Sequence, residues 1–192
     1  MSDLILHKEG FISKDHCQSL IDYFELNSEH HIEGVVGCNN KVDYSLKKCK
    51  ELVFFGKDYD LPILQPLLES LCNATNLYKK AYSFIDTLAL WNISPAFKMQ
   101  RYNPGEGYFV NHCENDGNCN GETERRLIAW MVYLNDVFDG GHTAFPYQDK
   151  KFQPRTGDIL LWPAYWTHPH HGIPSSSQIK YIVTGWFTYT ND

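Results

Sequence analysis

Long apolar runs and a signal-like amino terminus are both missing from this sequence. Nowhere do roughly 18 apolar residues follow one another, the length that marks a transmembrane helix. The first residues, MSDLILHKEG, do not place a basic segment before an apolar stretch, as a secretory signal would. We therefore expect a soluble, cytoplasmic protein without a membrane partner.

Clusters of positive charge are missing as well. The net charge is −6, and the lysines and arginines form neither runs nor stripes. Proteins that bind nucleic acid or anionic membranes do so through such clusters. The charge balance argues against nucleic acid as a partner and favours a small molecule or a protein as the substrate.

The six cysteines contain no CxxC pair, which removes the commonest pattern of a zinc or redox site. Without a signal for export, we interpret them as reduced thiols. One alternative stays open: Cys113 and Cys119 flank a Gly/Asn-rich segment and could pair under oxidation.

Length and composition indicate one domain over residues 1–192, because no repeat, low-complexity segment or composition break divides the chain. The first 83 residues are predicted to be a helical support. Ser13 can cap a helix whose apolar residues recur at helical spacing from Cys17 to Phe24, and the same period runs from Leu64 to Cys72. Residues 30–50 are polar and are expected to form a loop or a mobile flap.

From residue 84 to about 190 the sequence changes to short segments rich in β-branched and aromatic residues, separated by turn residues. This pattern predicts an α+β, mainly β fold, with an antiparallel sandwich or barrel on the helical support. The predicted strands are 86–93, 97–102, 126–135, 158–163 and 180–189.

Two histidine-containing segments suggest a metal site. WTHPHHG, residues 166–172, holds three histidines, and upstream His112 and Glu114 form an HxE pair. On a strand, residues two apart share a face, so the pair could converge on one ion. Two histidines and one carboxylate leave open positions on Fe(II), as in non-haem iron oxygenases. Alone, the HxE pair is weak, because nine histidines and 23 acidic residues produce such pairs by chance.

Over about residues 99–189 the order of motifs resembles the Fe(II)- and 2-oxoglutarate-dependent dioxygenases, in their prolyl 4-hydroxylase-like branch. The resemblance implies a double-stranded β-helix core of the jelly-roll or cupin type. The motifs that carry it are RYNPGEGYFVNH, HCE, MVYLND, GGHTAF, PRTGDILLW and HHGIP followed by IKYIVTGWF.

The resemblance also implies roles for single residues. His112 and Glu114 would be metal ligands, and the spacings to Pro174 and to Lys180 both select His170 as the third. Lys180 would bind the distal carboxylate of 2-oxoglutarate. Further contacts to 2-oxoglutarate are implied for three residues of the matching motifs: Tyr102, Tyr133 and Thr143.

Several assignments stay open at this point. His168 would share a face with His170 and remains a rival ligand, whereas His171 would point away. The family usually has Asp where this chain has Glu114, whose longer side chain could reach a metal with both oxygens. Asp116 is the alternative carboxylate.

Three further expectations concern the surroundings of the site. Arg126 matches an arginine frequent in this branch, although a surface position explains it equally well. Trp186 is on the Lys180 face of its strand and is expected to wall the pocket. Segments 28–60 and 114–124 are expected to flank the substrate entrance.

The activity implied by the resemblance is hydroxylation of an unactivated C–H bond. Fe(II), 2-oxoglutarate and O2 would be required, with ascorbate in support, and succinate and CO2 would be released. A prolyl residue of a peptide or protein is the favoured target. Two alternatives remain: a zinc hydrolase that uses the same His/Glu/His set, and a non-catalytic barrel that binds a ligand.

Overall fold

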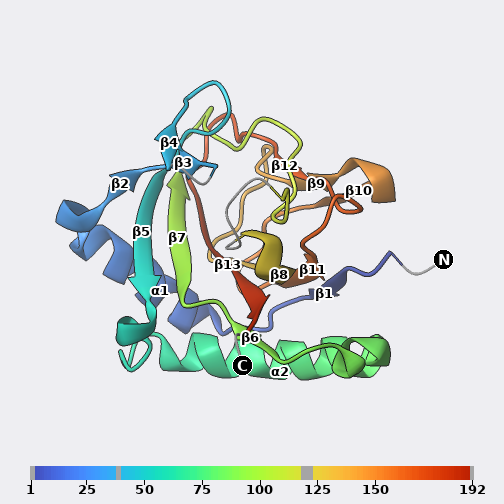
Figure 1. Cartoon of the computed structure of the whole chain (residues 1–192). Helices are drawn as coiled ribbons and strands as arrows, with labels where there is room; N and C mark the ends of the chain where they lie inside the picture. The colour runs from blue at the N-terminus through green and yellow to red at the C-terminus, as the bar shows by residue number, and fades with distance from the viewer. Residues whose placement is uncertain (1–2, 38–39, 118–122, 191–192) are drawn as a thin grey trace.

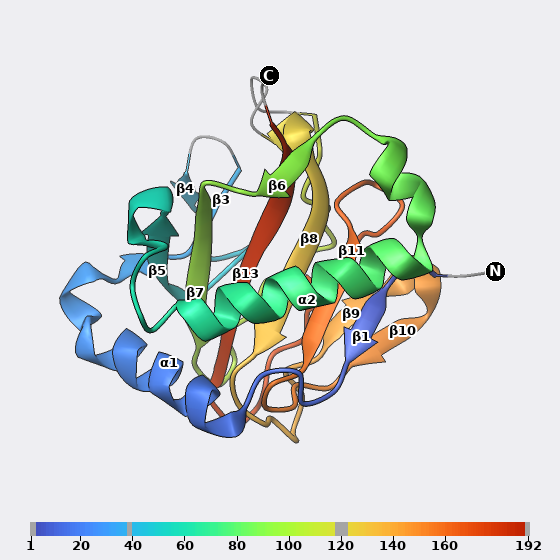
Figure 2. The same ribbon diagram turned by 90° about the horizontal axis from the view of Figure 1, so that it is seen from below.

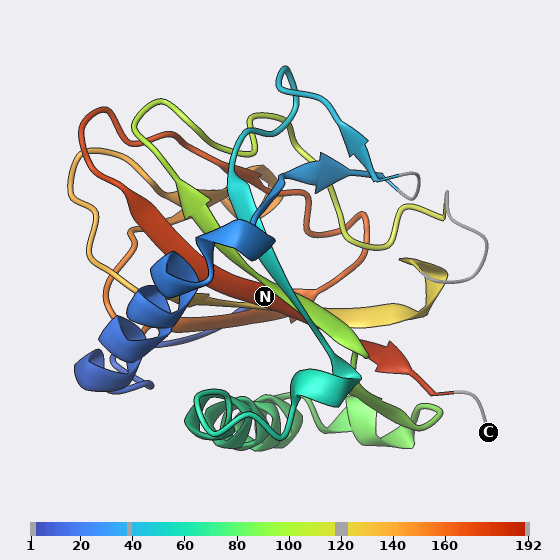
Figure 3. The ribbon, with the colours of Figure 1, turned by 90° about the vertical axis from the view of Figure 1, so that its left-hand side faces the viewer.

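The computed structural model describes residues 3–37, 40–117 and 123–190. Two helices, α1 (Lys14–Leu26) and α2 (Gln65–Ala81), lie against one face of a large antiparallel sheet. Figure 2 shows both helices in front of the strands, and Figure 3 shows the β3–β4 hairpin on the opposite side of the sheet. The molecule therefore has a helical side and an opposite side on which loops and short strands gather.

The large sheet has eight strands, all in antiparallel pairs. Seven of them lie in the order β1 (Leu6–Lys8), β11 (Ile159–Pro163), β8 (Arg126–Tyr133), β13 (Lys180–Tyr189), β7 (Ala96–Tyr102), β5 (Lys50–Phe55) and β2 (Ile32–Glu33). The eighth, β6 (Trp91–Ile93), also pairs with β13. β13 is thus central, with β8 on one side and β7 on the other (Figure 1).

Two smaller sheets complete the side opposite the helices. One is formed by β10 (Lys150–Phe152), β9 (Thr143–Phe145) and β12 (His171–Gly172), and the other by β3 (Val35–Val36) and β4 (Lys41–Val42). Phe145 of β9 packs edge-on against Trp162 of β11, with ring centroids 5.4 Å apart. Because of this contact, the β9 sheet is fixed against the large sheet.

The predicted helices are confirmed, and Ser13 caps α1 by accepting a hydrogen bond from the backbone N–H of His16 at 3.2 Å. The helical support predicted for residues 1–83 also contains strands that the sequence did not predict, since β1 and β5 belong to the large sheet. The segment 30–50 likewise contains short strands rather than only a loop. In the predicted strand 86–93, residues up to Thr87 belong to a 3-10 helix and only Trp91–Ile93 form a strand.

The main core fills the space between the helices and the large sheet. Alternate residues of each strand face it, such as Phe97 and Met99 of β7, and they pack with residues of α1 and α2 such as Leu20 and Leu67. At the centre of β13, Gly185 has no side chain because a Cβ there would lie 2.6 Å from Trp130 and 2.7 Å from Phe97.

No helix within the described part of the chain is both long and apolar enough to cross a membrane. Four of the cysteines, Cys17, Cys49, Cys72 and Cys113, are free thiols. Cys119, the suggested partner of Cys113, lies outside the described residues.

Candidate metal centre

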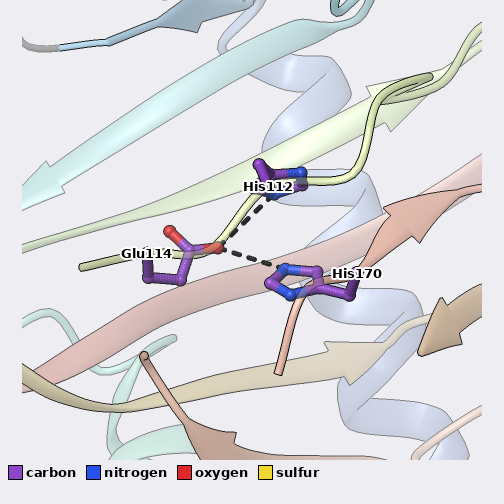
Figure 4. A group of neighbouring side chains, drawn as sticks. All are labelled: His112, Glu114 and His170. Atoms are coloured by element: carbon purple, nitrogen blue, oxygen red, sulfur yellow. Dashed lines mark ion pairs between the residues drawn. The ribbon is translucent and has the colours of Figure 1, made fainter. Parts of the chain in front are cut away.

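The side chains of His112, Glu114 and His170 converge on one point above the large sheet (Figure 4). One ligand atom from each residue can be chosen so that all three lie within 4.8 Å of one another. Glu114 Oε1 is 3.6 Å from His112 Nε2 and 3.3 Å from His170 Nε2. Two imidazole nitrogens and one carboxylate oxygen at this spacing form a set that a divalent transition metal can bind.

Outside the named strands, backbone hydrogen bonds hold the three residues in place. His112 and His170 form an isolated antiparallel bridge, with two backbone hydrogen bonds of 3.0 and 2.9 Å between them. The backbone N–H of Glu114 instead donates to the carbonyl of Ala164 at 3.0 Å. The two histidines are thus fixed to each other by the bridge, and the glutamate is fixed to the end of β11.

Hydrogen bonds also orient the two imidazole rings. Nδ1 of His112 lies 3.0 Å from the carbonyl oxygen of Val110, and Nδ1 of His170 lies 3.0 Å from that of His168. A carbonyl only accepts, so the ring proton belongs on Nδ1 and the Nε2 lone pair is directed at the centre of the cluster. Burial and the neighbouring His170 lower the pKa of His112, which favours this neutral form.

Glu114 presents its two oxygens to different partners. Oε1 faces the imidazoles, whereas Oε2 accepts a hydrogen bond from Trp186 Nε1 at 2.8 Å. The expectation that the longer side chain would offer both oxygens to a metal does not agree with this arrangement.

Arg126 is part of the same cluster and is not a free surface residue. Its Nη1 donates to the backbone carbonyl of Glu114 at 3.1 Å and lies 3.7 Å from Oε2 of the same residue. The guanidinium lies over the ring of Trp186, 3.6 Å from its centroid. The arginine therefore stabilises both the carboxylate and the indole that holds it.

The rival ligands lie outside the cluster. His168 is buried, but its Nε2 lies 2.8 Å from the carbonyl of Asp3 and its Nδ1 lies 2.9 Å from the Thr167 hydroxyl. The Nδ1 of His171 lies 2.7 Å from Asn111 Oδ1. Asp116 lines the neighbouring cavity but is not among the residues that converge.

A cavity of about 510 Å³ joins the metal centre to Lys180. The Lys180 side chain is buried, donates to the carbonyl of Gly141 at 3.0 Å and lies 4.7 Å from the Tyr102 ring centroid. Within the described residues, no carboxylate forms an ion pair with it. Burial lowers the pKa of Lys180 to about 8. An ammonium in this position requires an anion, and the carboxylate of a bound acid would supply it.

The three other residues expected to contact 2-oxoglutarate differ in position. Tyr102 and Thr143 line the cavity beside Lys180. Tyr133 does not line it and instead donates a hydrogen bond from its hydroxyl to Thr143 Oγ1 at 2.6 Å. Thr143 thus separates Tyr133 from the cavity. Trp186 does line the cavity, as its position on the Lys180 face of the strand predicted.

The structure adds cavity residues that the sequence did not single out. Tyr108 stacks on His112, with ring centroids 3.5 Å apart and planes at 11°. Lys47, Lys98 and Gln100 line the same cavity and meet at the buried Glu51. The alternation of polar and apolar residues in 97–102 contained a signal for two of them, since Lys98, Gln100 and Tyr102 must share a face.

Comparison with known proteins agrees with this geometry. Residues 97–188 match the family model described as the 2OG-Fe(II) oxygenase superfamily. This segment, which is just under half of the chain, is similar to that superfamily. The matched segment contains His112, Glu114, His170 and Lys180, so the family match and the converging side chains concern the same residues.

Individual relatives refine the family assignment. A protein of Acanthamoeba polyphaga mimivirus named "Putative prolyl 4-hydroxylase" is 29% identical over 140 residues, which is 66% of this chain and 53% of that protein. The chain thus spans about half the length of this curated relative.

Solved structures share the fold. A viral collagen prolyl hydroxylase from Paramecium Bursaria Chlorella virus-1, solved with 2OG, aligns with a TM-score of 0.72 and 20% identity, covering 98% of this chain and 97% of that one. A Trichoplax adhaerens prolyl hydroxylase, in complex with a hypoxia inducible factor peptide fragment, aligns with a TM-score of 0.71 and 17% identity, covering 98% and 84%. These similarities show a fold that the chain shares with prolyl hydroxylases.

Proposed function

We propose that this chain is an Fe(II)- and 2-oxoglutarate-dependent dioxygenase that hydroxylates a prolyl residue of a peptide or protein. The observation that carries the proposal is the presence, in one cavity, of a His/Glu/His cluster and a buried lysine without a carboxylate partner among the described residues. An enzyme whose cosubstrate is a dicarboxylate that chelates the metal requires two things: a metal centre for one end of the molecule and a cation for the carboxylate at the other end.

His112, Glu114 and His170 would hold Fe(II), through the two Nε2 atoms and Oε1. The fit is good, because both Nδ1 atoms are occupied by carbonyls and Oε2 is occupied by Trp186. When bound, Fe(II) with 2-oxoglutarate and O2 supplies the oxidising chemistry, which releases succinate and CO2. Ascorbate would support the enzyme by keeping iron reduced.

Lys180 would bind the distal carboxylate of 2-oxoglutarate and orient the molecule toward the metal. Thr143 and Tyr102, at the cavity wall beside Lys180, would add hydrogen bonds. Tyr133 would act indirectly, since its hydroxyl donates a hydrogen bond to Thr143 and fixes the direction of that side chain. Met131 and Ile182 also line the cavity and would exclude water from the reacting carbon.

We propose further that the antiparallel sheets form the double-stranded β-helix of this family. The packing of the β9 sheet against the large sheet, with the metal centre between them, supports this topology. The whole of 1–192 would then be one oxygenase domain, with the core in about residues 84–190 and an amino-terminal support that contributes β1 and β5 as well as two helices.

A peptide or protein substrate is supported by the relatives, one of which was solved with a peptide fragment. The β3–β4 hairpin contributes Val35 and Val36 to the cavity, and the 114–124 segment contributes Glu114, Asp116 and Thr123. These two segments are the proposed borders of the substrate entrance.

The two earlier alternatives are weaker. A zinc hydrolase has no use for a buried cation ten residues after a ligand, and the family match gives it no support. A non-catalytic barrel would not need the hydrogen bonds that orient both imidazoles toward one point.

Succinate formation tests the proposal directly. The protein is incubated with Fe(II), ascorbate, 2-oxoglutarate and a library of proline-containing peptides, and succinate and a 16-Da mass gain on the peptides are measured. Anaerobic mixing with Fe(II) and 2-oxoglutarate should also give a visible charge-transfer absorption band. Zn-dependent hydrolysis without that band would reject the oxygenase assignment.

A further inference from the structure

The end of the cavity away from Lys180 contains a second group of charges. Glu51 is fully buried and receives hydrogen bonds from four residues: Lys47, Cys49 at 3.8 Å, Lys98 at 2.9 Å and Gln100 at 2.9 Å. We call Lys47, Glu51 and Lys98 the two-lysine cluster. Both lysines line the cavity, whereas Glu51 lies behind them.

The charges of the two-lysine cluster do not balance. Lys47 is itself buried, with the ring of Tyr108 5.5 Å from its ammonium, and both Lys47 and Lys98 pair with the single carboxylate of Glu51. Lys98 adds a second positive charge that the buried carboxylate does not need. Its side chain is 18% exposed, so the ammonium is accessible from the cavity.

The walls around this surplus charge are mostly apolar. Six apolar residues belong to the lining together with Lys98, namely Ile32, Val35, Val36, Val53, Phe55 and Ala96, and the acidic side chains of the described lining are Glu114 and Asp116. A positive charge beside apolar surface is stabilised when an anion joins it. A ligand that fits here presents a carboxylate next to apolar groups.

The register of the sheet separates this place from the cosubstrate site. Lys180 pairs with Tyr102, and Thr184 pairs with Lys98. Lys98 and Tyr102 are four residues apart on β7, which corresponds to roughly 13 Å along the strand. Lys98 therefore lies well away from Lys180 along the sheet and is available for a second carboxylate.

We propose that the two-lysine cluster is a specificity subsite that binds a carboxylate of the peptide substrate, from an acidic side chain or from a free carboxyl terminus. This inference rests on the proposed function. The carboxylate accepts hydrogen bonds from the Lys98 ammonium, and apolar side chains of the same peptide contact Val35, Val53 and Phe55. Peptides with the neutral amide in place of the carboxylate leave the surplus charge unpaired and bind more weakly.

Binding of labelled peptide pools tests the subsite without turnover. The probes are fluorescein-labelled heptapeptides with a central proline and randomised apolar neighbours, bound to the protein loaded with Mn(II) and 2-oxoglutarate. In the first pair of pools, one pool contains Glu and the other contains Gln at the same position. In the second pair, one pool has a free carboxyl terminus and the other has a carboxyl-terminal amide. We expect at least one acidic pool to bind about tenfold more tightly than its neutral counterpart.

Variants assign the preference to Lys98. Lys98→Met leaves Glu51 paired with Lys47 and should reduce the acidic preference to less than about twofold, whereas Lys98→Arg should retain it. Lys48→Met is the matched control, because Lys48 is the neighbouring lysine, exposed and outside the cavity lining. Thermal unfolding of each variant shows whether it is folded.

Three results would overturn the subsite: equal binding of acidic and neutral pools to the wild-type protein, an unchanged preference in folded Lys98→Met, and no binding of any pool. Failure of the proposed function has a different readout, because it appears as absence of succinate with every pool, whatever the binding ratios are.

Discussion

The two faces of the large sheet are made from the same strands but have opposite chemistry. On β7, Phe97 and Met99 belong to the core beneath the helices, whereas Lys98, Gln100 and Tyr102 line the cavity. Adjacent residues of one strand thus differ in role, because side chains alternate between the faces of a sheet. One face packs the core, and the other lines the cavity with the proposed metal centre.

The same alternation holds on the central strand. β13 directs Val183 and Phe187 into the core and directs Lys180, Thr184 and Trp186 into the cavity. Apolar burial on the helical face stabilises the sheet. The sheet can therefore hold buried polar groups on its cavity face, although such groups cost free energy. If the two faces have these separate roles, substitutions on the cavity face should change metal or ligand binding, and substitutions on the helical face should change stability.

The largest effect is expected at the metal centre. His170→Ala should reduce succinate formation by about a thousandfold or more, because the residue acts as one part of a single catalytic unit. The bound metal, measured after dialysis, should be lost as well. His168→Ala is the control: it should retain the metal and substantial activity, since His168 contacts the Asp3 carbonyl and not the cluster. The reverse result would reject the assignment of His170.

On the helical face, Phe97→Ala should lower the free energy of unfolding by about 3 to 5 kcal/mol. Phe97 is fully buried, and its ring centroid lies 5.2 Å from that of Phe54 and 5.6 Å from that of Trp130. Urea unfolding measures the loss. Metal affinity of the protein that remains folded should not change, and a large decrease would break the separation of the two faces.

Lys180→Met should weaken 2-oxoglutarate binding by about a hundredfold. The buried ammonium is the only cation placed against the distal end of the proposed cosubstrate, within the part of the cavity that the structure describes. Lys180→Arg keeps the charge and should recover much of the affinity. Titration with 2-oxoglutarate in the presence of Mn(II) measures both variants, and unchanged affinity in Lys180→Met would place the cosubstrate elsewhere.

The affinity for 2-oxoglutarate should also depend on pH. Burial lowers the pKa of Lys180 to about 8, so the ammonium is present below pH 8 and is increasingly deprotonated above it. The dissociation constant should therefore be constant below pH 8 and rise by up to about tenfold per pH unit above it. Lys180→Arg should remove this dependence, because arginine stays charged throughout the range.

A smaller effect is expected from the indole that holds Glu114. Trp186→Phe removes the hydrogen bond to Oε2 but keeps an aromatic ring beneath Arg126, so metal affinity should fall by about tenfold. Trp130→Phe is the matched control on the helical face, where the buried indole nitrogen has no hydrogen-bond partner. It should alter stability alone, and equal losses of metal affinity in both variants would contradict the comparison.

The sequence predicted much of this arrangement, for physical reasons that differ between elements. Helical spacing identified α1 and α2, and segments of β-branched and aromatic residues identified β7, β8, β11 and β13, the last with its bounds. The strand β5 was missed because its apolar run, LVFF, is only four residues long and follows a polar segment that ends in Lys50 and Glu51.

Contacts between distant residues explain what the sequence could not supply for the site. The hydrogen bond from Trp186 to Glu114 joins residues 72 positions apart, and the bond from Lys98 to Glu51 joins residues 47 apart. The family motifs selected His112, Glu114, His170 and Lys180, but the part that each oxygen of Glu114 plays depends on tertiary packing. The charge surplus at Lys98 depends on it as well.

The place of β13 has a consequence for how the protein is made. It follows the seven other strands of the large sheet in the chain, yet it pairs with both β7 and β8 at the centre. While the chain is being synthesised, the edges of β7 and β8 that pair with β13 stay unpaired until Lys180–Tyr189 has left the ribosome. Because Lys180 and Trp186 arrive with β13, the nascent chain has no complete pocket to bind its cosubstrate. Truncation before this strand should therefore yield aggregates rather than a folded protein with part of the pocket.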